Sequence, residues 1–130
     1  MIKGIFFALL SSILMVVGLS PAFAHAVLVA SNPSANSSIF QMPKQITLTF
    51  SDPLLVFGKQ AINSVQVTNS AGRRITSSTA IVKGRVLTNF FTVKNVIVGK
   101  FYVVFRVVAQ DGHVVTGSFI FLVKNRIKRQ

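Results

Sequence analysis

The sequence predicts an all-β fold, a two-sheet sandwich of about seven strands. Past residue 25, apolar and polar residues alternate with a period of two, which is typical of half-buried strands. Clusters of turn residues separate these stretches about every ten residues, and no segment after the N-terminal run has a helical stripe. We therefore expect one Greek-key β-sandwich or barrel, with no internal repeat and no linker.

The chain begins with a segment typical of a secretory signal peptide. Lys3 supplies the positive start, the apolar run 5–19 follows, and Pro21 precedes the small residues Ala22 and Ala24. We expect residues 1–24 to be cleaved, leaving residues 25–130 as the exported domain. The alternative is an uncleaved membrane anchor, although the run is shorter than the roughly 18 to 20 residues that a spanning helix needs.

The exported part consists of strands joined by turns. Alternating apolar positions predict strands around 46–50, 65–67, 101–108 and 118–123, with turns at 31–34, 69–72, 83–85 and 98–100. The run 101–108 is apolar on both faces, which indicates a central strand. Arg106 on it then needs a partner or an exit to solvent, and we favour an ion pair. The irregular stretch 52–63 is expected to cross between the two sheets.

The composition is strongly basic. The 130 residues carry 14 Lys and Arg against two acids, a net charge of +12, which becomes +11 once Lys3 leaves with the signal peptide. This charge favours an anionic partner or an anionic membrane surface but does not define a binding site. The basic tail 124–129 is either a solvated terminus or a contact for lipid or another polyanion. No nucleic-acid-reading motif is present, so we expect no nucleic-acid partner.

The few groups with metal-binding chemistry stand at informative positions. Asp111 and His113 share the turn before the last strand, and the other histidine, His25, becomes the N-terminal residue on cleavage. The free amine and ring Nδ1 of an N-terminal histidine can chelate one ion. A second imidazole and a carboxylate would complete a tetragonal set typical of Cu(II) or Ni(II), with Cu(II) first in affinity. Zinc also accepts such donors, but it prefers a tetrahedron and often takes thiolates, and the chain has no cysteine.

Three segments carry a resemblance to a known family. The stretches "HAVLVASNPSANSSI", "ITLTFSDPL" and "GKFYVVFRVVAQDGHVVTGSFIFLV" resemble the CopC family of exported copper-resistance proteins over nearly the whole mature chain. The resemblance implies a cupredoxin-like or immunoglobulin-like β-sandwich in the periplasm. It also implies Cu(II), one ion per chain, held by His25, Asp111 and His113. The family's further acid falls on Asp52, as a weak ligand or as a partner of a ligand; the alternative is that Asp52 is only the acid of a turn before Pro53. The family's strand tryptophan is Phe105 here.

We therefore expect a monomeric Cu(II)-binding protein for copper sequestration, resistance or delivery to an inner-membrane transporter of the CopD type. We do not expect an enzyme, and no catalytic residue is assigned. A copper-dependent oxidative enzyme is the second hypothesis, against which stand the lack of tryptophan and the single tyrosine, Tyr102. A third sets the metal aside and assigns a basic sandwich that binds anionic membrane surfaces.

Overall fold

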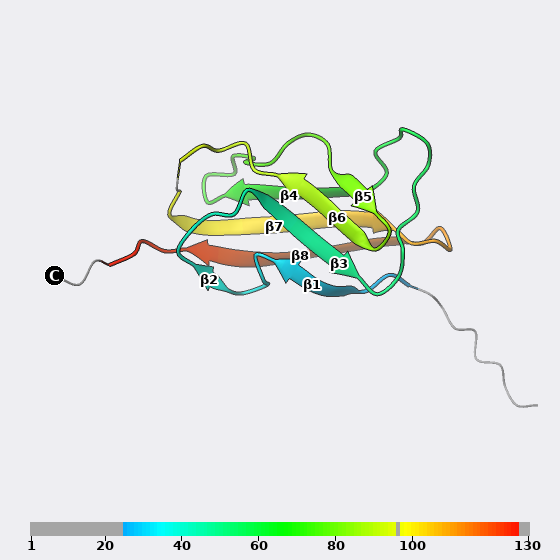
Figure 1. The fold of residues 1–130 in the computed structure, drawn as a ribbon, viewed down its shortest axis with the longest axis horizontal. Helices are drawn as coiled ribbons and strands as arrows, with labels where there is room; N and C mark the ends of the chain where they lie inside the picture. The colour runs from blue at the N-terminus through cyan, green and yellow to red at the C-terminus, as the bar shows by residue number, and fades with distance from the viewer. Residues whose placement is uncertain (1–24, 96, 128–130) are drawn as a thin grey trace, which may run out of the picture.

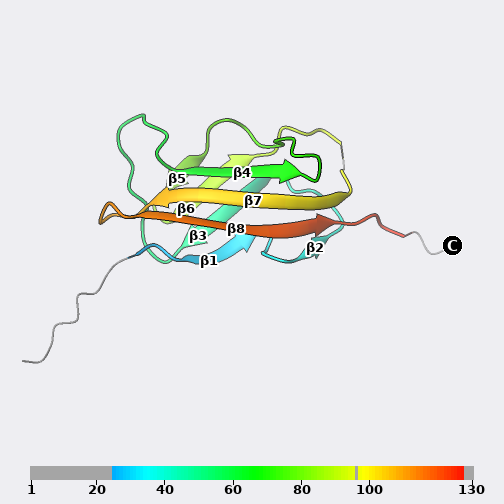
Figure 2. The same cartoon turned by 180° about the vertical axis from the view of Figure 1, so that it is seen from behind.

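The computed structural model describes residues 25–95 and 97–127, and these form two packed β-sheets. The predicted signal peptide, residues 1–24, lies outside the described residues. The described part contains eight strands (Figures 1 and 2). They are β1 (Leu28–Asn32), β2 (Ser38–Ile39), β3 (Gln45–Phe50), β4 (Ser64–Asn69), β5 (Ile81–Lys83), β6 (Val86–Phe90), β7 (Gly99–Val108) and β8 (Val114–Val123). Within the same ranges there is no helix long and apolar enough to span a membrane.

The sheet orders are β1-β3-β6-β5 and β2-β8-β7-β4. All pairs are antiparallel except β2 with β8. Strands that are neighbours in a sheet are often not consecutive in the chain, as in a Greek-key sandwich. The segment after β3 crosses to β4 in the other sheet, as the irregular stretch 52–63 predicted. The structure has eight strands where about seven were expected. The additional one is β2, which has only two residues.

The core follows the predicted alternation. Buried apolar side chains of both sheets fill the space between them, and the largest fully buried ones are Phe50, Phe101 and Phe121. The rings of Phe101 and Phe121 stack with centroids 5.2 Å apart, and Phe50 meets Phe105 edge-on at 5.6 Å. Burial of this apolar surface is what selects the register, because a one-residue slip would turn each buried set toward water.

The strand β7 is central, as predicted, lying between β8 and β4. Its second face is nevertheless exposed, since Tyr102 and Val104 retain 43% and 56% of their accessible surface. The ion pair favoured for Arg106 is not found among the described residues, and the side chain instead takes the alternative, an exit to solvent. This guanidinium is exposed, and its Nη1 donates to the carbonyl oxygen of Ile62 at 2.9 Å. An open face therefore removes the desolvation that would have required an acidic partner.

Four chain segments meet at one end of the sandwich. The N-terminal segment before β1, the end of β3, and the connection from β7 to β8 lie there, together with the β5–β6 hairpin (Figures 1 and 2). The last strand begins at Val114, earlier than the predicted 118, because the ladder with β7 continues to the pair Val108 and Val114. This long ladder carries the Asp-Gly-His turn out to the end of the molecule.

Candidate metal centre

The turn between β7 and β8 fixes the relative position of Asp111 and His113. The Gly112 backbone has φ +86°, a left-handed conformation that favours glycine, and the ends of the turn are closed by Ala109 N–H donating to the His113 carbonyl at 2.9 Å. Asp111 Oδ1 accepts the backbone N–H of His113 at 3.0 Å, and its Oδ2 lies 2.9 Å from His113 Nδ1. The Asp-Gly-His sequence thus forms a closed turn that presents one carboxylate and one imidazole together.

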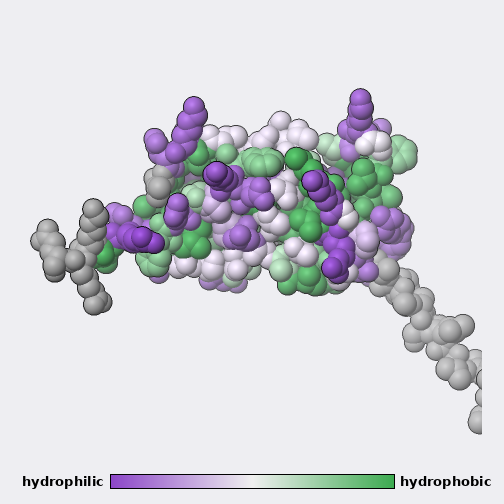
Figure 3. All heavy atoms as spheres, in the orientation of Figure 1, coloured by the Kyte–Doolittle hydropathy of each residue, from purple (hydrophilic) through white to green (hydrophobic). Residues whose placement is uncertain are grey.

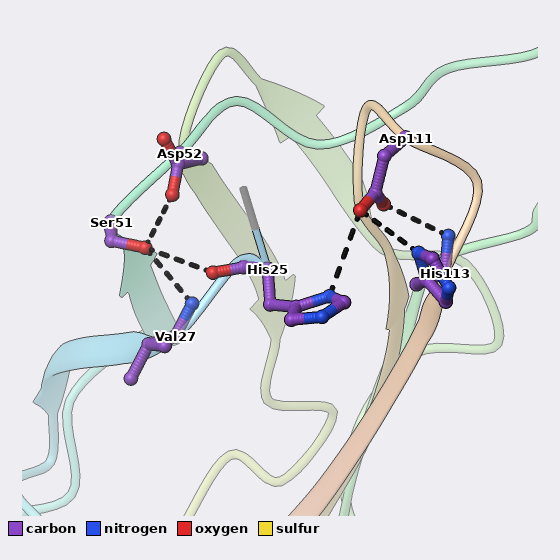
Figure 4. Close-up of polar contacts among 6 residues, drawn as sticks. All are labelled: His25, Val27, Ser51, Asp52, Asp111 and His113. Carbon is purple, nitrogen blue, oxygen red and sulfur yellow. Dashed lines mark hydrogen bonds and ion pairs between the residues drawn. The ribbon is translucent and has the colours of Figure 1, made fainter. Parts of the chain in front are cut away.

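The N-terminal segment is attached to the end of β3 by hydrogen bonds to Ser51. Val27 N–H donates to the Ser51 hydroxyl at 3.0 Å, and the same hydroxyl lies 3.5 Å from the His25 carbonyl oxygen (Figure 4). The Ser51 N–H in turn donates to the Val27 carbonyl at 2.8 Å. Ala26 is 1% exposed and packs into the core. His25 is therefore followed directly by the buried Ala26 and the hydrogen-bonded Val27. These two residues restrict where the His25 ring can lie.

These two segments bring three donors together. His25 Nδ1 lies 3.6 Å from Asp111 Oδ2, and the His25 and His113 rings meet edge-on with centroids 4.8 Å apart (Figure 4). One ligand atom from each of the three residues lies within 4.8 Å of the others. Donors on opposite sides of an ion bound at about 2 Å per ligand are about 4 Å apart, so small side-chain rotations would close the set around one ion.

The cluster is open to solvent and holds its carboxylate ionised. The side chains of His25 and His113 are 45% and 61% exposed, and that of Asp111 is 28% exposed. The backbone N–H and the ring of His113 lower the pKa of Asp111 below its ordinary value of 3.8, and the nearby His25 adds to this effect. The site thus offers a charged oxygen and imidazole nitrogens at the surface, which suits an ion that must enter and leave.

The fourth predicted residue, Asp52, stands outside this group. Its carboxylate accepts the Ser51 hydroxyl at 2.7 Å, and it points toward Ser51 while the three donors point toward one another (Figure 4). The group of metal-type side chains among the described residues contains His25, Asp111 and His113 without it. Asp52 is therefore linked to the segment that holds His25 only indirectly, because it binds the Ser51 hydroxyl that accepts the Val27 amide.

The sequence analysis missed Ser51 and Ala26. The first receives the Val27 amide and the second anchors the terminus, yet neither has metal-binding chemistry. A signal for both was present. Ser51 stands inside the "FSDP" stretch next to Asp52, and Ala26 is the small residue directly after the histidine.

The fold and the cluster define a class of protein, an all-β domain with a surface nitrogen and oxygen site at one end. Comparison with known families identifies it further. A model of the CopC domain matches residues 28–124, and the chain belongs to this family. The resemblance and the β-sandwich predicted from the sequence are both confirmed.

Individual relatives agree with this assignment. The chain is 32% identical over 104 residues to the copper transport protein CutJ of Bacillus subtilis (strain 168), which covers 77% of this chain and 18% of that relative. The chain thus spans less than a fifth of CutJ.

Solved structures share the fold. The crystal structure of CopC from Methylosinus trichosporium OB3b superposes with a TM-score of 0.68 at 28% identity, covering 82% of this chain and 100% of that one. PcoC, a methionine-rich copper resistance protein from Escherichia coli, superposes with a TM-score of 0.63 at 24% identity, covering 78% and 100%. At that identity, PcoC supports the fold alone.

Proposed function

We propose that this chain is an exported Cu(II)-binding protein that sequesters copper or delivers it to a membrane copper transporter. The observation that carries the proposal is the convergence of His25, Asp111 and His113, whose ligand atoms lie within 4.8 Å of one another. Membership in the CopC domain family supports copper as the ion. In this role copper is the cargo of the protein.

Cleavage after Ala24 would complete the site. It would free the His25 amine, and the amine and the ring nitrogen of the same residue would then bind one ion as a chelate. Together with the His113 imidazole and the Asp111 carboxylate, this gives three nitrogens and one oxygen. A tetragonal nitrogen and oxygen set favours Cu(II), which also leads the order of affinities among divalent ions.

Two other copper chemistries have less support. Cu(I) prefers thioethers and thiolates, but the chain has three methionines, of which Met42 alone lies in the described residues, and no cysteine. Oxidative catalysis on a polysaccharide needs a flat aromatic platform, and the chain has one tyrosine and no tryptophan. We therefore propose binding without catalysis.

The exposed site suits transfer of copper between proteins. Its ring and carboxylate donors are reachable from solvent, so a partner's ligands could replace them one at a time. We propose a periplasmic monomer with one ion, which meets a transporter of the CopD type at the inner membrane. The relation to the copper transport protein CutJ supports a transport role over simple storage.

Electron paramagnetic resonance of the chain that begins at His25 tests the proposal. All eight strands lie after this residue, so this form contains the whole described fold. With one equivalent of Cu(II) we expect a tetragonal, nitrogen-rich spectrum. The matched control carries one extra alanine before His25, which keeps every side chain but moves the amine away. A changed spectrum and weaker binding in the control are expected.

Three results would contradict the proposal. Identical spectra from both forms would show that the terminal amine is not a ligand. Retention of the spectrum in His113→Gln would remove the second imidazole from the site. Loosely bound copper in all forms would leave the protein without a Cu(II) site of the kind proposed.

A further inference from the structure

The charges of this protein are divided unequally between the two ends of the sandwich. Both aspartates of the chain, Asp52 and Asp111, lie at the end that carries the candidate metal centre. The other ends of the strands lie together at the opposite end of the sandwich, because Gln45 pairs with Phe90, Asn69 with Phe101, and Gly99 with Val123. We call this second end the basic end.

Seven of the eleven Lys and Arg among the described residues lie at the basic end, in its loops or at the first residues of its strands. They are Lys44, Arg73, Arg74, Lys94, Lys100, Lys124 and Arg126. The other four, at the end with the metal centre, are Lys59, Lys83, Arg85 and Arg106. Because no acid lies at the basic end, its positive charge is uncompensated, whereas two aspartates offset part of the charge at the other end.

Apolar side chains are exposed among these cations. Phe40, Val98 and Ile127 retain 54%, 55% and 89% of their accessible surface at the basic end. Figure 3 shows hydrophilic side chains projecting around hydrophobic ones at its left-hand end, where β8 ends and β7 begins. Two surface hollows also open there, one lined by Lys44 and Lys94 and the other by Lys100.

We propose that the basic end docks on an anionic phospholipid surface, with the metal centre facing away from the bilayer. Clustered Lys and Arg near an anionic leaflet bind its lipid headgroups, and apolar residues among them can enter the boundary with the acyl chains. Exposed apolar residues such as Phe57 also occur at the other end, so the charge distribution is what selects the basic end. This inference does not depend on the proposed metal site.

Vesicle sedimentation with the metal-free chain from His25 tests the proposal, in the presence of a chelator. The unaltered protein is expected to bind vesicles of phosphatidylcholine with about one third phosphatidylglycerol, and not vesicles of phosphatidylcholine alone. Binding should weaken steeply as salt is raised, because the Debye length falls to about 3 Å at 1 M.

Matched pairs of lysines separate the two ends. Lys100→Gln with Lys124→Gln removes two charges from the basic end, and Lys59→Gln with Lys83→Gln removes the same charge from the other end. All four are exposed. Each cation near the surface contributes about fivefold to partitioning, so we expect a loss of about 25-fold for the first pair and less than about fivefold for the second.

A fluorescent reporter gives the orientation, since the chain has no tryptophan of its own. Val98→Trp is expected to shift its emission to the blue on anionic vesicles, whereas Phe57→Trp at the other end is not. Three results would overturn the proposal: no binding of the unaltered protein, equal losses for the two lysine pairs, or a blue shift confined to position 57. Preference for duplex DNA over vesicles at equal charge would assign the basic end to nucleic acid instead.

Discussion

The absence of a side chain at Gly117 sets up a stability prediction, because an added Cβ atom would meet a buried ring. Gly117 lies on β8 directly opposite Phe105 on β7. A Cβ atom added at Gly117 would lie 2.4 Å from Phe105 Cζ and 2.7 Å from Cε1, where ordinary contacts are 3.4 to 4 Å. In Gly117→Ala the ring would have to move by about 1 Å. It is 6% exposed and meets the fully buried Phe50, so it has little room to move.

The magnitude follows from two opposing effects. Overpacking of a well-packed core costs about 1 to 3 kcal/mol, and this contact stands at the upper end because two ring atoms are involved. Alanine recovers about 0.5 to 1 kcal/mol relative to glycine within a strand. We expect Gly117→Ala to lower the free energy of unfolding by about 2 kcal/mol, and Tm by about 10 °C for a domain of this size.

Urea denaturation followed by circular dichroism measures this effect, and a double-mutant cycle assigns it to the ring. Leucine at position 105 lacks the ring atoms that meet the new methyl group. Gly117→Ala should therefore cost less than about 0.5 kcal/mol in a Phe105→Leu background, which gives a coupling energy of about 1.5 to 2 kcal/mol. Equal costs in both backgrounds, or a neutral Gly117→Ala, would refute the reasoning.

Three further predictions concern the candidate metal centre. Copper affinity should fall at least about a hundredfold from pH 8 to pH 5, because the terminal amine, with an ordinary pKa of about 7.7 to 8.0, must lose its proton to bind; an affinity that does not change in a competition titration would exclude the amine. Ser51→Ala removes the acceptor of the Val27 amide and should weaken copper binding about tenfold. Asp52→Asn keeps an acceptor for the Ser51 hydroxyl and should change copper binding less than about threefold. A larger effect of Asp52→Asn would make that carboxylate a ligand. The pKa of Asp111 is lowered on folding, so its carboxylate stabilises the metal-free fold above pH 3.8 and loses this effect as the pH falls through the folded pKa. The free energy of unfolding should therefore decrease less with falling pH in Asp111→Asn than in the unaltered protein. Equal pH dependence of the two proteins would contradict the lowered pKa.

Much of the fold was predictable because it depends on local pattern. The period of two places Phe101, Val103 and Phe105 on one face of β7, and burial of that face is observed. The exposed second face was not predictable, because Tyr102 and Val104 are apolar enough to suggest cover on both sides. Only the packing of the second sheet decides which face is covered.

The donors of the site were predictable from their scarcity. A chain with two histidines and two aspartates leaves few possible metal groups, and the Asp-Gly-His turn already joins Asp111 to His113. The division of roles between the acids was not predictable. Asp52 is as acidic as Asp111 in the sequence, but in the fold it contacts Ser51 and stays outside the group.

The sequence by itself determined the fold class, the turn that pairs Asp111 with His113, and the position of His25 directly after a cleavage pattern. These follow from periodicity and from neighbours in the chain, which act over a few residues. Only the tertiary structure decided that His25 reaches that turn, since the approach depends on Ala26 entering the core and on Ser51 binding the Val27 amide. The separation of a basic end from the end with both aspartates was likewise decided by topology, because strand order, and not sequence distance, determines which loops share an end.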